Sequence, residues 1–409
     1  MNLRSHPYEN YRVSNNEWVA QIPSEWAEKR VKDLFRLVTD SAPIDNNHEL
    51  LSLYASIGVR PRKDLEARGN KASSTDGYWL VKKGDIVVNK LLAWMGSVGL
   101  SDFDGVTSPA YDVLRKTSST LDERYFSYLF RTDIAKQIFK KNSRGIMDMR
   151  LRLYFDKLGA ITVPVPPFSI QQAIAAYIDT KTAQLDRQID LLSQKATQYG
   201  KLKQSLINET VTRGLDKTVP MKDSGVEWIG EVPAHWEVRH LKNLAEIKGG
   251  KDSKAVELEE GGYPVYGSGG IFGRASKYLY KKPSVLLGRK GTIDKPLFVT
   301  EPFWSVDTMF YTEVKCNVDP KFFYYQCLTI QFGQYQYGSA VPSMAQNVLR
   351  QILFATPDYP EQQAIATYLD GKTAQIDSIV VTINSQIDRL RELRKTLIND
   401  VVTGKIKVA

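Results

Sequence analysis

Apolar residues recur at alternating intervals of three and four positions in two stretches of the chain, residues 171–212 and 362–403. This spacing places apolar side chains along one narrow stripe of an α-helix, the pattern of a coiled-coil seam. Neither stretch contains proline, and each has one interior glycine. We therefore predict two long helices, each about 60 Å in length at about 1.5 Å per residue. The predicted packing positions are Ile178, Leu185, Leu192, Tyr199 and Leu206 in the first helix and Leu369, Ile376, Ile383, Leu390 and Leu397 in the second.

The two stretches are copies of one another. Aligned without a gap at an offset of 191 positions, they are identical at 18 of 42 residues, beginning with QQAIAAYIDTKTAQLD at 171–186 and QQAIATYLDGKTAQID at 362–377. A second repeat precedes them, EWVAQIPSEWAEKRVKDL at 17–34 and EWIGEVPAHWEVRHLKNL at 227–244. The chain is therefore two tandem units, each with an opening motif, a variable region and a helix.

Both copies keep the apolar stripe although the variable regions differ. This is expected if the two helices pack on each other, and the alternative is that each helix lies only on its own domain. Prolines before each helix mark domain boundaries. We predict a first globular domain at 1–165, a first helix at 166–215, a second globular domain at 216–356 and a second helix at 357–409.

The two variable regions mix strand-like and helical runs. Examples of the first kind are GDIVVNK at 84–90 and PSVLLGRKG at 283–291, and of the second ERYFSYLFRT at 123–132 and KFFYYQCLT at 321–329. We expect an α+β fold class, in which two mixed globular domains are joined by a coiled coil of two long antiparallel helices with approximate two-fold symmetry.

The chain of 409 residues has a formal net charge of +9. The helical copies carry almost none of this charge, because 171–212 holds five Lys/Arg against four Asp/Glu and 362–403 five of each. A basic excess in two globular regions favours an acidic partner such as nucleic acid. No apolar run reaches the length of about 18 residues that a membrane helix needs, so we expect a cytoplasmic protein without membrane contact.

Three stretches resemble catalytic motifs, but each lacks a residue, a structural element or a spacing that the reaction requires. VPPF at 165–168 resembles the loop with which DNA adenine methyltransferases hold the target amino group, but Val165 stands where a side chain must accept a hydrogen bond. YGSGGIFG at 266–273 is Gly-rich, yet it opens no evident helix and so does not fit a cofactor loop. Asp307 and Glu313 are too close in sequence to indicate a metal-dependent nuclease.

The remaining reactive residues point to no site either. The four histidines make no helical pair with a glutamate. Cys316 and Cys327, the two cysteines, are expected to be buried free thiols. We expect no catalytic residue, bound cofactor or metal in this chain.

Both variable regions place basic, aromatic and amide side chains in glycine-containing loops. Such loops hold phosphates through Lys, Arg, Ser and main-chain N–H groups, and they read base edges through Arg, Asn or Gln. The candidate DNA-binding residues are Lys90, Trp94, Ser97, Arg144, Asp148 and Arg150 in the first region and Tyr266, Ser268, Gly269, Arg274, Arg289, Lys290, Ser339, Ser343 and Gln346 in the second.

The doubled opening motif and the doubled QQAIA…KTAQ motif resemble the specificity subunit of type I restriction–modification systems across essentially the whole chain. The resemblance implies that each variable region is a target recognition domain reading one half of a split, asymmetric site in double-stranded DNA. It implies that the helices set the distance between the half-sites and dock two methylation subunits, through which restriction subunits join. S-adenosylmethionine, ATP and magnesium would then belong to those partners.

Other functions fit parts of the pattern. A coiled-coil scaffold could display two domains that bind proteins instead of DNA, and the basic charge of the domains argues against it. A solitary specificity subunit without active partners is a further alternative, and a stand-alone modifying enzyme is disfavoured by the missing motifs.

The first unit has only a short arm, YENYRVSNN at 8–16, before its opening motif. We hypothesise that this arm is a stub whose other half is supplied by the segment after Val402.

If the helices measure the distance between half-sites, a longer helix should change the recognised spacing. We predict that inserting four residues after Ser193 alters the spacer length of the modified DNA site, because each residue adds about 1.5 Å to a helix. Mapping methylated adenines in cells that carry the variant measures the spacer. A site identical to that of the unaltered chain would contradict the prediction.

Overall fold

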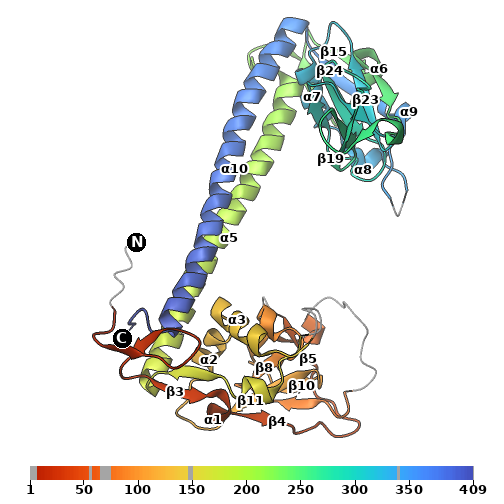
Figure 1. The fold of residues 1–409 in the computed structure, drawn as a ribbon. Coiled ribbons are helices and arrows are strands. Elements are labelled where there is room, and N and C mark those ends of the chain that lie inside the picture. Colours follow the sequence, from red (N-terminus) through yellow and green to blue (C-terminus); the bar gives the residue numbers. More distant parts are fainter. Residues whose placement is uncertain (1–6, 55–57, 65–74, 146–150, 339–340, 409) are drawn as a thin grey trace. The chain divides into compact units, whose positions relative to one another are not determined.

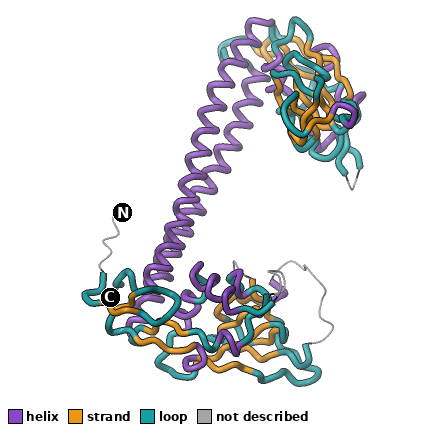
Figure 2. The backbone as a smooth tube through the Cα atoms, viewed as in Figure 1, coloured by secondary structure: helices purple, strands orange, loops and turns teal. Residues whose placement is uncertain are grey.

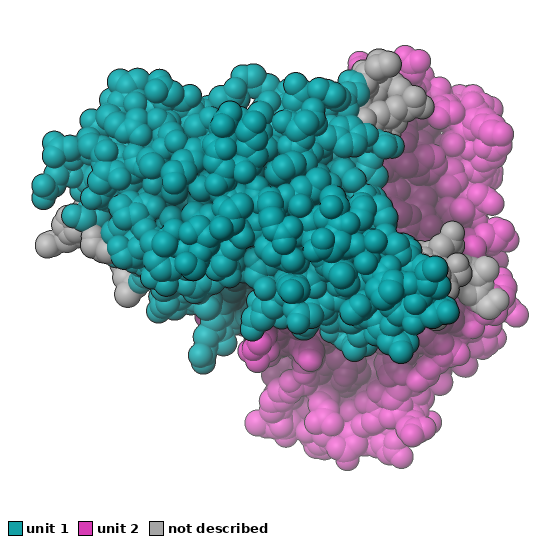
Figure 3. Space-filling view, turned by 90° about the horizontal axis from the view of Figure 1, so that it is seen from below, with its two compact units in different colours: residues 1–191, 386–409 teal, residues 192–385 magenta. Residues whose placement is uncertain are grey.

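The computed structural model describes residues 7–54, 58–64, 75–145, 151–338 and 341–408. The chain forms two compact units, residues 1–191 with 386–409 and residues 192–385 (Figure 3). Two long helices, α5 (Phe168–Arg213) and α10 (Tyr359–Val402), each contribute one half to either unit. Each unit therefore contains one globular domain and a segment of both helices (Figure 1).

The globular domain of unit 1 is built on an antiparallel sheet of four strands in the order β4-β11-β8-β9 (Figures 1 and 2). Helices α2 and α3 follow the sheet, and β12 leads into α5 after pairing with β3. The elements are β1 (Tyr11–Val13), β2 (Gln21–Pro23), β3 (Ala27–Arg30), α1 (Val31–Leu34), β4 (Phe35–Val38), β5 (Leu51–Tyr54), β6 (Gly58–Pro61), β7 (Trp79–Val81), β8 (Ile86–Asn89), β9 (Val98–Leu100), β10 (Gly105–Thr107), β11 (Tyr111–Lys116), α2 (Glu123–Leu129), α3 (Asp133–Asn142), α4 (Phe155–Leu158) and β12 (Thr162–Val165).

Unit 2 repeats this plan with the sheet β16-β23-β20-β21 and adds a second sheet, β17-β19-β18-β22. Its elements are β13 (Met221–Asp223), β14 (Glu231–Pro233), β15 (Glu237–His240), α6 (Leu241–Leu244), β16 (Ala245–Gly249), β17 (Glu257–Leu258), β18 (Tyr263–Gly267), β19 (Gly270–Ala275), β20 (Ser284–Gly288), β21 (Leu297–Val299), β22 (Trp304–Ser305), β23 (Met309–Val314), α7 (Pro320–Cys327), α8 (Phe332–Tyr335), α9 (Gln346–Leu349) and β24 (Leu353–Thr356). The expected α+β class with two mixed domains and two long helices is confirmed.

The two long helices pair in opposite directions along a narrow seam. In unit 1 the Arg394 Nε atom lies 3.1 Å from the carboxylate of Asp186, and in unit 2 the Lys203 Nζ atom lies 2.6 Å from that of Asp377. The second pair is the first one transferred by the 191-residue offset of the repeat. Of the predicted packing residues, the buried ones are Ile178, Leu369, Ile376, Ile383 and Leu397, and the half-buried ones are Leu185, Leu192, Tyr199, Leu206 and Leu390.

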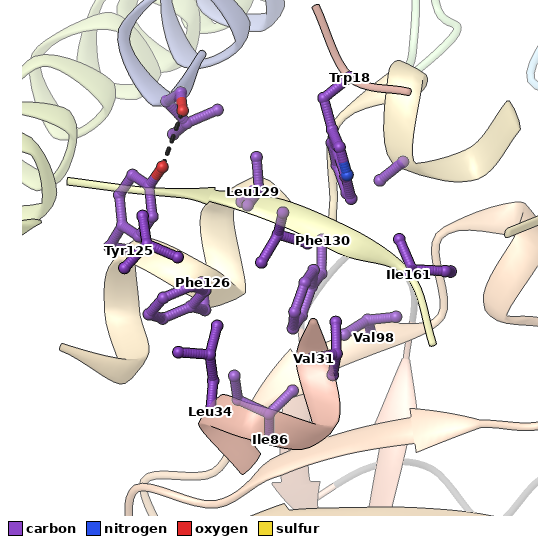
Figure 4. Close-up of a cluster of buried hydrophobic side chains, with 14 of the residues drawn as sticks. Trp18, Val31, Leu34, Ile86, Val98, Tyr125, Phe126, Leu129, Phe130 and Ile161 are labelled. Atoms are coloured by element: carbon purple, nitrogen blue, oxygen red, sulfur yellow. Dashed lines mark hydrogen bonds between the residues drawn. The ribbon is translucent and has the colours of Figure 1, made fainter. Parts of the chain in front are cut away.

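The core of unit 1 requires residues from both ends of the chain. Trp26 is buried in the same cluster as Val401 and Val402 from the last turn of α10. Tyr125 of α2, labelled in Figure 4, donates a hydrogen bond of 2.9 Å from its hydroxyl to the carbonyl oxygen of Val402. Burying a large apolar side chain stabilises a fold by roughly 1.5–3 kcal/mol, so the end of α10 contributes substantially to this domain.

Unit 2 buries the equivalent residues. Trp236, which the repeat aligns with Trp26, lies in one cluster with Ile207 and Val211 of the last turns of α5. This cluster also contains Ile365 and Leu369 from the start of α10. In each unit, then, the globular domain packs on the beginning of one long helix and on the end of the other.

Two buried glutamines attach the domains to the helices in the same way. Gln171 accepts a hydrogen bond from the Asp122 N–H (2.9 Å) and donates one to the carbonyl oxygen of Pro166 (2.9 Å). Gln362 accepts from the Asp319 N–H (2.8 Å) and donates to Pro357 (3.0 Å). Asp122 and Asp319 are the N-cap residues of α2 and α7, so each glutamine orients a short helix against a long one.

On each long helix, one aspartate contacts both a tyrosine hydroxyl and a cationic side chain. In unit 2 the Tyr325 hydroxyl donates to Asp370 (2.5 Å), and the Lys321 Nζ atom lies 3.2 Å from the same carboxylate. Burial and Asp370 together raise the pKa of Tyr325. The unit 1 counterparts are Tyr128 and Arg124 on Asp179.

The N-terminal arm forms a complete hairpin, β1 with β2, whose register matches that of β13 with β14. The arm is therefore not a stub, which corrects half of the hypothesis. The segment after Val402 does pack beside it, because the Tyr11 hydroxyl donates to the Gly404 carbonyl oxygen (3.0 Å) and Ile406 and Val408 join the core of unit 1.

Both cysteines are free, but only one is buried. Cys327 lies inside unit 2, where burial raises the pKa of its thiol well above the usual value. Cys316 is exposed, contrary to the expectation, because it follows the end of β23 in the turn before α7.

We predict that Gln362→Ala destabilises unit 2 by about 1–3 kcal/mol, because the Asp319 N–H and the Pro357 carbonyl lose their buried partner. Hydrogen exchange followed by mass spectrometry would show lost protection in α7 and β24. The neighbouring exposed Gln363→Ala is the matched control and should leave exchange unchanged. Equal protection in both variants would contradict the prediction.

Candidate nucleic-acid interface

Three loops of unit 2 meet at one end of its two sheets. They are the β18–β19 turn, the loop after β20 that contains Arg289 and Lys290, and the segment around Ser343 that precedes α9. The Met344 N–H donates to the Arg289 carbonyl oxygen (2.9 Å), and the Gly291 N–H to that of Pro342 (2.9 Å). These main-chain hydrogen bonds join two segments more than 50 residues apart in sequence into one surface.

Glycines allow the tight path of the loop after β20. A Cβ atom on Gly288 would lie 2.2 Å from the Thr292 carbonyl oxygen, a distance that no side chain tolerates. Gly291 has φ +86, a left-handed conformation that other residues adopt only with strain. The two glycines thus fold Arg289 and Lys290 into a short projecting turn.

The candidate residues of unit 2 divide into exposed and structural ones. Lys290, Arg274 and Gly269 are exposed, and Arg289 and Ser268 are half-buried. Two others have roles within the fold. Tyr266 is 9% exposed and packs edge-on against Phe303, and Gln346 donates through Nε2 to the Ile247 carbonyl oxygen (2.7 Å). Ser343 is buried as well, in β-bridges to Lys290 and Tyr337.

The loops of unit 1 that carry candidates also meet. The Leu153 N–H donates to the Lys90 carbonyl oxygen (2.9 Å), which joins the loop after β8 to the segment before α4. Arg144 is exposed and pairs with Asp156 (3.1 Å). Trp94 is half-buried, with the Lys140 Nζ atom 5.4 Å from its ring centroid. Ser97 is buried, whereas the candidates Asp148, Arg150 and Ser339 lie outside the described residues.

Lys90 is held inside unit 1. Its Nζ atom lies 3.5 Å from the carboxylate of Asp112, and the side chains of the two residues are 21% and 8% exposed. Burial raises the pKa of Asp112, although the charge of Lys90 acts in the opposite direction. The second carboxylate oxygen of Asp112 is buried without a hydrogen-bond partner among the described residues. Lys90 therefore neutralises a costly buried charge.

Sequence reasoning missed several exposed apolar side chains at these loops. In unit 2 they are Ile271, Phe272, Tyr337 and Val341, and in unit 1 Leu91, Leu92 and Met95. Apolar residues in a strand-like pattern are expected to point inward, so only the structure identifies those that do not.

The described residues contain no group of three or more His, Cys, Asp or Glu side chains arranged to hold a metal ion. In unit 1 an open groove of about 710 Å³ runs between α3 and the end of α10 and is bordered by the cations Arg131, Lys136, Arg394 and Lys395. Within the described ranges, no helix has the length and apolar character needed to cross a membrane. The groove beside α3 is also lined by Asp133, Glu392 and Asp400, which pair with its lysines, so the exposed loops supply the cations that suit a polyanion.

The doubled domain plan and the paired helices have counterparts in known proteins. Residues 23–198 and 233–389 each match the model of the type I restriction modification DNA specificity domain. These matches cover most of the chain, which therefore belongs to this family.

Known proteins resemble the chain over nearly their whole length. The type I restriction enzyme MjaVIII specificity subunit of Methanocaldococcus jannaschii is 24% identical, and the alignment covers 95% of this chain and 94% of that protein. A chain from a structural study of complex assembly and conformational transition of the type I restriction–modification system is similar with a TM-score of 0.75 at 14% identity, covering 94% of this chain and 99% of that one. The HsdS subunit from Thermoanaerobacter tengcongensis follows with a TM-score of 0.57 at 13% identity, covering 94% and 98%.

We predict that Lys90→Met destabilises unit 1 by about 3–5 kcal/mol near neutral pH, because it leaves the Asp112 carboxylate buried and unpaired. A carboxyl group whose pKa is raised by folding favours the folded state at low pH, and this contribution is lost as the pH rises through the folded-state pKa. The loss in Lys90→Met should therefore shrink in acid. Denaturant titration at several pH values measures this loss of stability, and hydrogen exchange assigns it to unit 1.

Two control variants isolate the cause of that loss. Lys83→Met removes an exposed lysine from the same domain and should leave stability unchanged. Adding Asp112→Asn to Lys90→Met should recover most of the stability. A loss that is independent of pH and persists in the double variant would show that Lys90 stabilises the loop by packing.

Proposed function

We propose that this chain selects the DNA sequence on which a type I restriction–modification enzyme acts. Each globular domain reads one half of a bipartite site in double-stranded DNA. The single observation that carries the proposal is that one domain plan occurs twice on one repeated helix while the surface loops differ. Two domains with different loops can recognise two different sequences, as the two halves of an asymmetric site require.

The loops supply chemistry that such reading needs. In the second domain Lys290 and Arg274 are exposed, and Arg289 is half-buried with its Nη1 atom donating to the Asp307 carbonyl oxygen (3.3 Å). Lys290 lies in the loop after β20 and Arg274 in strand β19. Cations that a rigid surface holds in place neutralise phosphates and donate to base edges. In the first domain the exposed Arg144 has the same role in this proposal.

The paired helices serve two purposes in this proposal. They separate the two readers, so that helix length determines the number of base pairs between the half-sites. They also dock two copies of a methylation subunit, because equivalent ion pairs such as Asp186–Arg394 and Lys203–Asp377 give each unit the same helical frame. Identical partners need identical docking surfaces, and a repeated helix provides them.

Catalysis belongs to the partners in this proposal. The methylation subunits bind S-adenosylmethionine and transfer its methyl group to adenine. Restriction subunits, joined through them, use ATP and magnesium to cleave DNA. The chain itself contributes recognition and assembly.

Co-expression of the chain with its methylation subunit, followed by single-molecule sequencing of the host genome, tests the function. We expect N6-methyladenine on both strands of a split, asymmetric motif. The purified complex should bind a duplex carrying that motif with an affinity that falls steeply as salt rises. A stable complex that methylates no motif and binds duplex independently of salt would overturn the proposal and favour a protein-interaction scaffold.

A further inference from the structure

Two neighbouring apolar residues of β19, Ile271 and Phe272, are 54% and 62% exposed. A regular strand turns successive side chains to opposite faces, so one of the two would normally be covered. The pairing of β18 with β19 shifts here, since Val265 pairs with Gly273 but Tyr266 pairs with Ile271. Phe272 is therefore the extra residue of a β-bulge, a feature that redirects side chains. Through this bulge both apolar side chains face outward.

The hairpin that carries them is fixed in place. Strand β19 pairs with β17 on one side and with β18 on the other. A Cβ atom on Gly267 would lie 3.1 Å from Cε1 of Phe272. The aromatic ring therefore packs directly against the main chain of Gly267, which has no side chain. The ring thus has a defined position although most of its surface is exposed.

Cationic residues adjoin the exposed pair. Thr308 also lies beside Gly267. Its Oγ1 atom is 3.5 Å from the position that a Cβ atom on Gly267 would occupy. The Thr308 carbonyl oxygen accepts hydrogen bonds from the N–H groups of Arg289 and Lys290, at 2.9 and 3.3 Å. One surface therefore combines a rigid apolar projection with two cations of the candidate interface.

We propose that Phe272, supported by Ile271, is a wedge that enters a base step of the DNA half-site read by the second domain. The inference rests on the proposed function and names a specificity-determining residue within it. Apolar side chains inserted between base pairs unstack them partially and bend the duplex. Arg289 and Lys290, which adjoin this projection, complement the charge of phosphates, which makes duplex DNA a better occupant of this surface than a protein partner.

A wedge selects sequence without a hydrogen bond to any base. Pyrimidine–purine steps unstack with the least cost, so the second domain should favour such a step where Phe272 enters. For the same reason a mismatch at that step should strengthen binding of the unaltered chain, because part of the unstacking is already done.

The test uses the chain assembled with its methylation subunits and a synthetic duplex that carries the mapped motif. A fluorescent adenine analogue, placed at each position of the second half-site in turn, reports unstacking by a rise in emission. We expect a rise at one step with the unaltered chain and none with Phe272→Ala. Phe272→Ala should bind the duplex about 10-fold more weakly, as expected for the loss of one stacked aromatic side chain. It should also gain nothing from a mismatch at the step.

Two further variants keep the result interpretable. Phe272→Trp retains an aromatic wedge and should restore the emission, whereas Leu258→Ala removes a 38% exposed apolar side chain from the same sheet and should change neither readout. Unaltered emission and affinity in Phe272→Ala overturn the wedge while leaving the proposed function intact. Loss of methylation-subunit binding in the absence of DNA would instead make the pair a protein contact. An unaltered complex that binds no duplex overturns both inferences.

Discussion

The dependence of each globular domain on both long helices governs the rest of the structure. Val401 and Val402 complete the core around Trp26, and Ile207 and Val211 complete the core around Trp236. A domain that lacked these helix ends would expose apolar side chains, and in unit 1 the Tyr125 hydroxyl would lose the Val402 carbonyl oxygen as an acceptor. The helices therefore have to run in opposite directions, and the repeated segment has to occur twice, before either domain is complete.

Because each domain packs on both helices, the residues that make this contact have to be equivalent in the two units, whereas other residues can differ. Residues that join a domain to the helices are equivalent in both units, as in the contacts of Gln171 and Gln362. The loops that carry the DNA-binding candidates differ between the units in length and composition. An exposed loop residue such as Lys290 can change at little cost to the frame, whereas a change at a joining glutamine leaves buried polar groups without a partner and a change at Lys90 leaves a buried charge unpaired.

The sequence predicted the frame well because periodicity and internal repetition are properties of long segments. The seam from Ile178 to Leu397, the strand within GDIVVNK and the short helix within ERYFSYLFRT all followed from local patterns. The candidate surface was predicted less well, because burial there depends on contacts between distant loops. Tyr266 and Gln346 have the residue types of DNA readers, yet one fills the core and the other holds the main chain of Ile247.

The β-bulge at Phe272 shows why such a surface escapes sequence analysis. The glycine-rich stretch YGSGGIFG fits a turn, and its apolar residues fit a strand, but nothing in it states that the register shifts between Val265 and Tyr266. The shift is a feature of how β19 pairs with β18. Because a one-residue change of register reverses which side chains face outward, the most exposed apolar residue of the hairpin is fixed by tertiary pairing. The outward position of Phe272 is therefore set by strand pairing that the sheet holds in place.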